Sequence, residues 1–208
     1  MAGLFEPAPD GGAAIALDSV EISILRNLTA QLLELIGPGP GAAEGPDGPG
    51  ADADPLAALF ADGPTKPPAD PALARLFPDA YRPDALGEGP ESADEAAAAS
   101  AEFRRYTEND LRARKREDGL AMIRTLDAAS AGAAGGGGAV VRLGAEDCGH
   151  WLGALNDLRL TLGSRLEIDD DESTEIYELA DDDPRKPLAM AYLWLGGLQE
   201  TLLEVLMG

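Results

Sequence analysis

The chain has 208 residues, of which 45% are hydrophobic, and it carries a formal net charge of −22 at pH 7. This length allows one domain with a sizeable core or two small domains. The strong negative charge repels phosphate backbones, so direct binding of nucleic acid by the whole surface is disfavoured.

Several features favour a cytoplasmic location. The first ten residues carry neither the basic start nor the long apolar core of a signal peptide. The single cysteine, Cys148, permits no intramolecular disulfide, as is typical of a reducing compartment. The most apolar segment, 188–207, contains Gln199, Glu200 and Glu204, which a bilayer-spanning helix of about 20 apolar residues would not carry. We therefore expect no association with a membrane.

A short hairpin and a helix are predicted at the start of the chain. The segments 4–6 and 14–17 flank an Asp-Gly-Gly turn signal, and prolines after the first segment make it an edge strand or coil. Asp18 and Glu21 are spaced as in a capping box. We expect the helix over 18–36, where a Gly-Pro pair ends it.

The composition changes from residue 37 to residue 71, where nine of the 16 prolines lie. We expect a flexible Pro/Gly-rich loop at 37–69, for which a linker between domains and a long insertion in one domain are both compatible. A short helical turn ending at Pro78 follows, with three apolar residues on one side. The favoured interpretation is a loop held on the core by aromatic side chains, with Tyr81 just beyond it.

A long helix is predicted over 91–129, and its middle is locally basic. Seven of the 16 cationic residues lie there: Arg104, Arg105, Arg112, Arg114, Lys115, Arg116 and Arg124. One interpretation is a solvated face or an internal counter-charge to the acidic segments. The alternative is a partner-binding surface made by the first six of these residues.

Four further elements complete the chain. A Gly-rich hinge at 132–138 lacks the Gly-Lys-Ser/Thr sequence of a phosphate loop. A strand is predicted at 140–143 and a helix over 146–166, whose large apolar residues from Trp151 onward recur at spacings of 4, 3, 4 and 4. The last helix, over 188–206, has few polar positions and is predicted to be the central helix of the core.

The two strand-then-helix segments resemble each other at an offset of 126 residues. Leu25 then corresponds to Trp151, and Leu32 corresponds to Leu158. This pattern suggests two similar halves whose strands pair and whose helices pack together. Contact between the strands 14–17 and 140–143 would support that interpretation.

The residues that could carry chemistry are few. Ten of the seventeen residues in 167–183 are acidic, but they lack the Gly and Glu positions of a calcium-binding loop, so we expect a solvated loop and no metal. Cys148 and His150 cannot build a zinc site alone, and their side chains diverge on a helix. A structural, inert thiol is the favoured reading of Cys148, and a redox-responsive thiol is the alternative.

Asn156, Asp157 and Arg159 interrupt the apolar run of the 146–166 helix. They form either a polar network that fixes the packing of the helix or a partner-binding surface. The sequence as a whole predicts no enzyme and no cofactor. It predicts a mainly α fold: one domain over 1–208 with about four main helices and a small antiparallel β element at 14–17 and 140–143, with 4–6 as a candidate third strand.

Three segments carry a family resemblance. The first, from Trp151 to Leu166, includes Asn156, Asp157 and Arg159; the second, from Asp70 to Arg82, includes Arg75 and Tyr81; the third, from Tyr192 to Glu200, includes Trp194. Together they resemble the signatures of an actinobacterial domain family of long-unknown function, whose genes tend to lie beside that of the ClpS protease adaptor. The resemblance covers nearly the whole chain apart from the loop at 37–69.

This family includes AosR-type oxidative-stress regulators. The resemblance therefore implies a redox-linked protein that binds a stress sigma factor and raises transcription of cysteine-biosynthesis genes. In the family, that role is attributed to two cysteines spaced Cys-x-x-x-Cys. Here the residue four after Cys148 is Leu152, so a local disulfide is impossible. The departure weakens the expectation of redox sensing and leaves that of partner binding.

We therefore expect a non-enzymatic regulatory protein that acts on transcription by binding a sigma factor or another part of the transcription machinery. An adaptor or partner of the ClpS/Clp proteolysis machinery is one alternative, suggested by the gene neighbourhood in the family. A small-molecule-binding protein is the other. The oligomeric state is left open.

Overall fold

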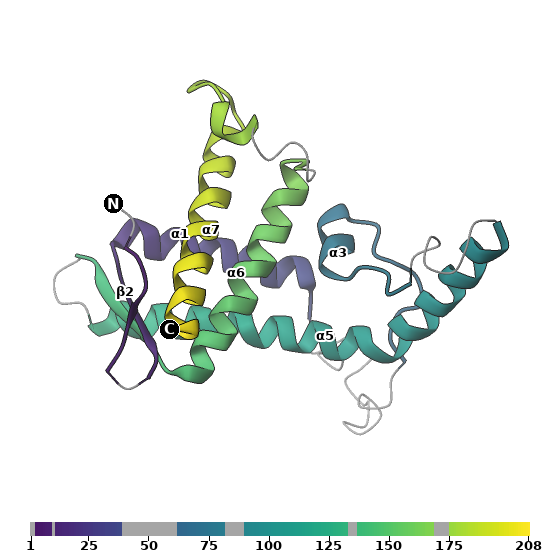
Figure 1. Cartoon of the computed structure of the whole chain (residues 1–208), viewed down its shortest axis with the longest axis horizontal. Helices are drawn as coiled ribbons and strands as arrows, with labels where there is room; N and C mark the ends of the chain where they lie inside the picture. The colour runs from purple at the N-terminus through teal and green to yellow at the C-terminus, as the bar shows by residue number, and fades with distance from the viewer. Residues whose placement is uncertain (1–2, 10, 39–61, 82–89, 133–136, 169–174) are drawn as a thin grey trace, which may run out of the picture. The chain divides into compact units, whose positions relative to one another are not determined.

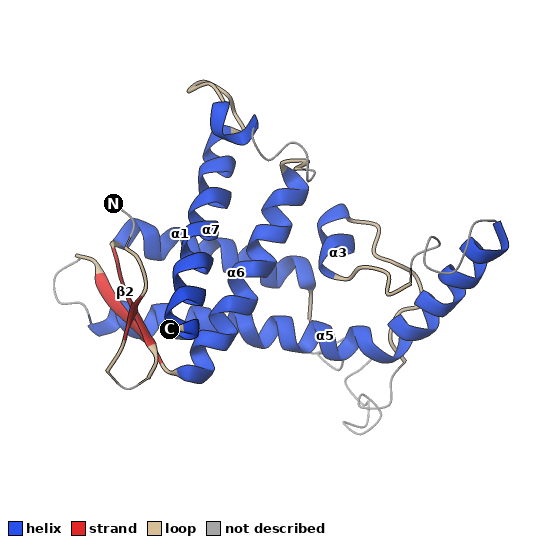
Figure 2. Cartoon of the chain, viewed as in Figure 1, coloured by secondary structure: helices blue, strands red, loops and turns tan. Residues whose placement is uncertain are grey.

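The computed structural model describes residues 3–9, 11–38, 62–81, 90–132, 137–168 and 175–208 (Figure 1). Helices make up most of this described part (Figure 2). They are α1 (Ser19–Ile36), α3 (Pro71–Leu76), α5 (Pro90–Gly132), α6 (Ala145–Arg165) and α7 (Lys186–Met207), with a 3-10 turn η1 (Glu175–Glu178). The predicted mainly α fold with a small antiparallel sheet is confirmed.

The chain divides into two compact units. The first comprises residues 1–35 and 117–208, and the second comprises residues 36–116. Helix α5 contributes its first part to the second unit and its last part to the first unit. The single domain over 1–208 stays a prediction. Most of the loop predicted at 37–69 and of the hinge predicted at 132–138 lies outside the described residues.

The sheet of the first unit has three antiparallel strands in the order β1-β2-β3. These are β1 (Glu6–Pro7), β2 (Ala13–Leu17) and β3 (Ala139–Leu143). The strand proposed at 4–6 is therefore shorter and starts later. It is an edge strand, where a proline is tolerated because its missing N–H leaves no gap in a central ladder.

The strands β2 and β3 pair as the internal resemblance predicts. Ile15 lies opposite Val141, its own equivalent at the offset of 126 residues. The register is symmetric about this pair, because Ala13 meets Leu143 and Leu17 meets Ala139. The two halves therefore meet about a local two-fold axis at the middle of the ladder.

Helix α1 begins with the predicted capping box. The Asp18 Oδ1 atom accepts hydrogen bonds from the N–H groups of Val20 and Glu21, and a Glu21 carboxylate oxygen accepts one from the Asp18 N–H. These contacts satisfy N–H groups that the first helical turn leaves free. In the first unit, the Thr29 hydroxyl of α1 lies 3.2 Å from the sulfur of Met122 on α5.

Helices α6 and α7 run antiparallel and lie side by side (Figure 1). The α7 residues Leu195, Leu198 and Leu202 are buried, whereas Met190 and Met207 are exposed. Helix α7 therefore buries one face only and lies at one side of the core. The sequence prediction that it forms the centre of the core is wrong in this respect, because its apolar residues extend around more of the helix than the core covers.

Candidate functional site

Trp151, the first residue of the first signature segment, lies in the core of the first unit. Its side chain is fully buried, and its indole N–H donates a hydrogen bond of 2.9 Å to the Thr125 hydroxyl of α5. The Phe5 ring packs edge-on against it at 5.8 Å between ring centres. The Phe5 N–H in turn donates to the hydroxyl of Thr201 on α7. Trp151 therefore links α6 to α5 and to the segment just before β1, and it is closed to a partner.

Arg159 faces α7 and joins two of the three signature segments. Its Nη1 atom donates a hydrogen bond of 2.7 Å to the side-chain oxygen of Gln199, and Nη2 lies 3.5 Å from the Tyr192 hydroxyl. The guanidinium carbon lies 5.2 Å from the centre of the Tyr192 ring. Gly196 lies beside it, since a Cβ atom there would be in ordinary van der Waals contact with Nε at 3.5 Å.

The Nε atom of Arg159 is buried and has no hydrogen-bond partner among the described residues. No carboxylate of the described chain pairs with this guanidinium, whose acceptors are an amide and a phenol. Burying a cation without a counter-charge costs free energy. Arg159 is therefore a charged group with unused donor capacity.

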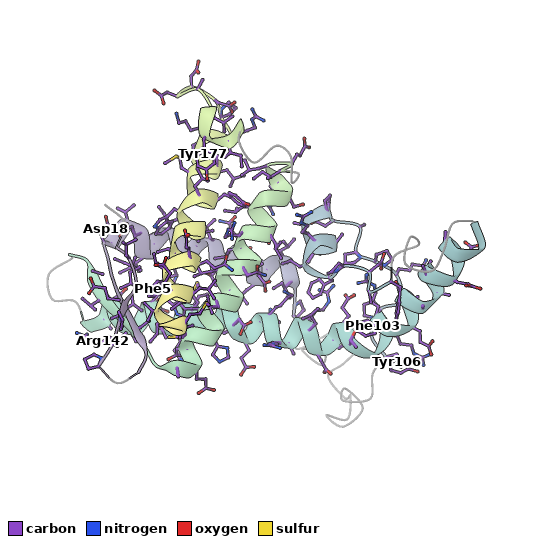
Figure 3. All side chains as sticks on the ribbon, in the orientation of Figure 1. Phe5, Asp18, Phe103, Tyr106, Arg142 and Tyr177 are labelled. Carbon is purple, nitrogen blue, oxygen red and sulfur yellow. The ribbon has the colours of Figure 1, made fainter. Side chains whose placement is uncertain are left out.

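Arg159 lies in the wall of a groove with a volume of about 1020 Å³. We call it the Arg159 groove, and it lies within the first unit between α6, α7 and η1. Its lining includes Arg159, Ile176, Tyr177, Tyr192, Leu193, Gly196, Gln199, Glu200, Leu203, Glu204 and Met207. Figure 3 shows Tyr177 beside the first half of α7. The groove combines one cation, two carboxylates and several apolar side chains.

The sequence did not single out Tyr192, Gly196 and Gln199 as partners of Arg159. The glycine pair at 196–197 inside a helix, which costs about 1 kcal/mol per residue, was a possible signal, but a Cβ atom would meet only ordinary contacts at Gly196 and nothing within 4 Å at Gly197. Spacing along α7 could have added Tyr192 and Gln199, which lie one turn on either side of Gly196.

The other polar and aromatic signature residues of the first unit are distributed differently. Asp157 is buried at 2% exposure, whereas Asn156 is exposed. Trp194 is partly buried, and its indole nitrogen has no hydrogen-bond partner in the described chain. The sequence motif Asn156-Asp157-Leu158-Arg159 is thus divided among solvent, the core and the groove.

The second signature segment lies in the second unit, next to α5. The Asp70 side chain caps α3 by accepting from the N–H groups of Ala72 and Leu73. Arg75 is exposed, and Tyr81 is half-exposed and packs edge-on against Phe103 of α5 at 6.3 Å. Figure 3 labels Phe103 and the exposed Tyr106 on α5.

Arg104, a candidate for the partner surface, is buried in a charged network of the second unit. Both of its terminal nitrogens donate to the backbone carbonyl of Phe77 at 3.0 Å. It pairs with Glu108 at 2.5 Å and with Asp79 at 2.8 Å. Burial would lower the pKa of Arg104, but hydrogen bonds to Asp79 and Glu108 outweigh this effect and raise that pKa.

Arg112 extends the same network. It pairs with Glu108 at 2.7 Å, donates to the backbone carbonyl of Ile36, and stacks its guanidinium 4.3 Å from the centre of the Phe77 ring. Arg116 donates to the carbonyl of Gly37. Three of the six basic candidates thus hold neighbouring segments of their own unit.

The remaining basic candidates are closer to solvent. Arg105 is exposed and pairs with Asp62, Arg114 is exposed, and Lys115 is partly buried. A partner surface on this helix stays a prediction. Arg104 and Arg112 pair with carboxylates of their own unit, as the internal counter-charge interpretation predicts for these two residues.

Cys148 is buried at 0% exposure near the start of α6. Its sulfur lies 3.9 Å from the backbone carbonyl of Leu143. Burial raises the pKa of the Cys148 thiol above its ordinary value. A protonated, enclosed thiol is a poor nucleophile, because the thiolate is the reactive form.

His150 lies two residues further on and contacts Asp118 of α5. Its Nδ1 atom is 2.7 Å from an Asp118 carboxylate oxygen, and both side chains are mostly buried. Gly153 permits this arrangement, since a Cβ atom there would lie 2.3 Å from the other Asp118 oxygen. The pair links α5 to α6 within the first unit.

Two searches of the described ranges gave negative results. No helix there is long and apolar enough to cross a membrane. No three His, Cys, Asp or Glu side chains there are grouped so that they could hold a metal ion. Residues 169–172 of the acidic stretch considered for calcium lie outside the described part.

Comparison with known proteins identifies relatives. A family model described as "Domain of unknown function (DUF2017)" matches residues 1–206. The "Oxidative stress regulator AosR" of Mycobacterium tuberculosis (strain ATCC 25618 / H37Rv) is 34% identical over 142 residues, covering 68% of this chain and 60% of the relative. The protein of the same name from Mycobacterium bovis (strain ATCC BAA-935 / AF2122/97) has the same identity and coverage.

A relative from Mycobacterium leprae (strain TN) is 31% identical over 144 residues, covering 67% of this chain and 60% of the relative. The chain thus spans about 60% of the length of the curated relatives it matches. No solved structure matches it.

Proposed function

Because the chain belongs to the family described as the domain of unknown function DUF2017, we propose that it is a non-enzymatic regulatory protein of the oxidative-stress response. The observation that carries this proposal is the identity of 34% over 142 residues with proteins named oxidative stress regulator. The family match extends over almost the entire chain, so the similarity is not confined to one motif.

We further propose that it acts on transcription by binding a protein, such as a sigma factor or another part of the transcription machinery. The net charge of −22 supports a protein partner over DNA, because phosphate contacts need clustered cations. The Arg159 groove supports it as well, since it offers apolar and charged side chains together in one place.

The burial of Cys148 bears on how such a regulator would respond to oxidation. Its thiol is enclosed and its pKa is raised, so we expect direct reaction with peroxide in the folded state to be slow. In this chain the regulatory role would therefore depend on partner binding, with oxidation sensed elsewhere.

The test is a deletion of the gene combined with affinity purification of the tagged chain. We expect the deletion to change the transcriptional response to peroxide, and we expect a sigma factor or polymerase subunit among proteins recovered from stressed and unstressed cells. Cys148→Ser should recover the same partners. An unchanged peroxide response in the deletion strain would refute the stress role, and recovery of ClpS or a Clp ATPase alone would favour a proteolytic adaptor.

A further inference from the structure

Among the described residues, no carboxylate forms an ion pair with the cation of the Arg159 groove. Arg159 bonds to the neutral acceptors Gln199 and Tyr192. Arg104 also has a buried Nε without a partner in the described chain, but it meets both Glu108 and Asp79, so the lack of a paired carboxylate there is what distinguishes Arg159. A carboxylate that reaches the terminal nitrogens of a partly buried guanidinium forms a charge-assisted hydrogen bond, which is stronger than one between neutral groups.

Apolar side chains lie exposed around the same groove. Tyr177 is 72% exposed, Met207 is 85% exposed and Leu203 is 40% exposed, and all three line it. Apolar residues that gather around a hollow, with polar residues at the edge, mark interaction sites. Single exposed apolar residues need no such explanation, but a group around one cation does.

The shape of the groove follows helix α7. Five of its lining residues recur along α7 at spacings of 4, 3, 4 and 4, namely Tyr192, Gly196, Gln199, Leu203 and Met207. This spacing is the stripe that packs against another helix. The groove thus runs along four turns of α7, about 22 Å at 1.5 Å per residue, with Arg159 lying against Tyr192, Gly196 and Gln199 and with Leu203 and Met207 exposed.

The charges on the rim indicate what flanks that partner. Glu200 and Glu204 are exposed, lie one turn apart on α7, and line the groove. Like charges at this spacing repel each other, and cations from a partner would relieve the repulsion. A second copy of this chain is disfavoured as the occupant, because two chains of −22 repel each other.

We propose that the Arg159 groove binds an amphipathic helical segment of a protein partner. Such a segment carries one carboxylate for Arg159, apolar side chains for Leu203, Met207 and Tyr177, and Lys or Arg residues near Glu200 and Glu204. This proposal rests on the proposed function, because it assigns the surface through which that function would act.

The first experiment exposes the full chain to a phage-displayed library of amphipathic helices about 16 residues long. We expect the enriched helices to share a single Asp or Glu within an apolar stripe, with Lys or Arg at its edges. A synthetic peptide of the most enriched sequence should bind the chain in solution. Changing its acidic residue to the amide should weaken binding about tenfold, which corresponds to a lost charge-assisted hydrogen bond of about 1.4 kcal/mol.

Matched variants place the binding in the groove. Arg159→Gln and Leu203→Asp should each weaken binding of the peptide at least tenfold. Arg165→Gln removes an exposed cation from the same helix α6 outside the groove lining, and it should leave binding unchanged. Leu206→Asp is the control for Leu203→Asp, because Leu206 is 42% exposed on α7 but does not line the groove.

Measuring the amide peptide against the Arg159→Gln chain completes a double-mutant cycle. If the acidic residue of the peptide contacts Arg159, the loss of affinity in the double change should be smaller than the sum of the losses in the two single changes. Leu203 is exposed, so its variant remains informative even if Arg159→Gln proves unstable. Enriched helices without an acidic residue, or equal binding by Leu203→Asp and Leu206→Asp, would overturn the proposal. So would self-association of the free chain that Leu203→Asp abolishes, because a second copy would then occupy the groove.

The fate of this proposal can be separated from that of the proposed function. If the deletion strain shows a normal peroxide response while the peptide still depends on Arg159 and Leu203, the stress role fails and the groove stands. If Arg159→Gln and Leu203→Asp both restore the peroxide response in full, the groove proposal fails and the stress role stands.

Discussion

At the scale of single residues, burial sets the reactivity that we expect of the single cysteine. Cys148 is enclosed between β3 and the start of α6, and the enclosure disfavours the thiolate. The flanking Asp147 carboxylate acts in the same direction. The sequence alone could only balance a helix N-terminus, which promotes ionisation, against nearby acidic residues, which oppose it.

The raised pKa of Cys148 predicts a loss of stability at alkaline pH. Above about pH 8.5 the thiol of the unfolded chain ionises, while the folded thiol stays protonated. The folded state then binds more protons, so the free energy of unfolding falls as pH rises, by at most about 1.4 kcal/mol per pH unit, until pH passes the folded pKa.

Urea unfolding of the wild type and of Cys148→Ala from pH 7 to pH 10 measures this effect. The difference in unfolding free energy between the two chains should be constant up to about pH 8 and then shrink. The variant cancels the contributions of Tyr and Lys groups that titrate in the same range. A difference that stays constant to pH 10 would show that the thiol ionises freely in the folded chain.

Glu108 is the second residue whose surroundings matter, because it is a buried carboxylate between two arginines. Its side chain is 3% exposed and meets both Arg104 and Arg112. Glu108→Gln leaves two cations with one fewer counter-charge in a buried place, and we expect it to cost about 3–5 kcal/mol of stability. Denaturant unfolding of the variant measures this cost.

Glu117→Gln provides the control for that measurement. It removes the same charge from an exposed position of α5 and should change stability by less than about 0.5 kcal/mol. Similar small losses in both variants would mean that water reaches the Arg104 network. The comparison is made within one helix, so helix propensity cancels.

At the scale of elements, the two strand–helix segments meet through a pair of glycines. A Cβ atom on Gly12 would lie 1.9 Å from the Leu143 carbonyl oxygen, and one on Gly138 would lie 2.4 Å from the Leu17 carbonyl oxygen. Gly138 is the equivalent of Gly12 at the offset of 126 residues, and Leu143 is the equivalent of Leu17. The same close approach therefore occurs at both ends of the β2–β3 ladder.

Gly12→Ala and Gly138→Ala are each expected to destabilise the chain by about 1–3 kcal/mol, because the backbone must shift to admit the added methyl group. Thermal unfolding monitored by circular dichroism measures the loss. Gly137→Ala is the control, since nothing lies within 4 Å of a Cβ atom there. It should be neutral or stabilise by up to about 1 kcal/mol through the unfolded state. Equal effects of Gly137→Ala and Gly138→Ala would contradict the close approach.

At the scale of the whole molecule, repulsion among the excess negative charges lowers the stability of the folded chain, and ion pairs raise it. The charge of −22 opposes a compact state, while exposed pairs such as Arg26–Asp127 and Arg124–Asp147 favour it. Exposed pairs contribute about 0–1 kcal/mol each and are screened by salt, as the repulsion is. The excess of 38 acidic over 16 basic side chains makes repulsion the larger effect.

We therefore expect the melting temperature to rise by a few degrees between 10 mM and 200 mM sodium chloride, since added salt shortens the screening length from about 30 Å to less than 10 Å. Differential scanning calorimetry at pH 7 measures this change. An equal concentration of sucrose should give a smaller increase. A melting temperature that falls with salt would mean that the ion pairs outweigh the repulsion.

The sequence by itself determined the local features of this protein. The apolar period of 3.6 residues, the Asp18–Glu21 capping box and the glycine-rich breaks predicted the main helices and the two paired strands, because each signal lies within one or two turns of chain. Even the pairing of β2 with β3 was accessible, since the repeat offset linked them.

Only the tertiary structure decided which way the polar side chains face. Arg159 meets Gln199 forty residues later, and Arg104 meets the Phe77 carbonyl twenty-seven residues earlier. Neither pairing has a local sequence signal. The sequence of a basic run does not show whether its cations face solvent or a buried carboxylate. Long-range packing selects between these arrangements, because removing a charge from water costs free energy unless the folded chain brings compensating groups to it.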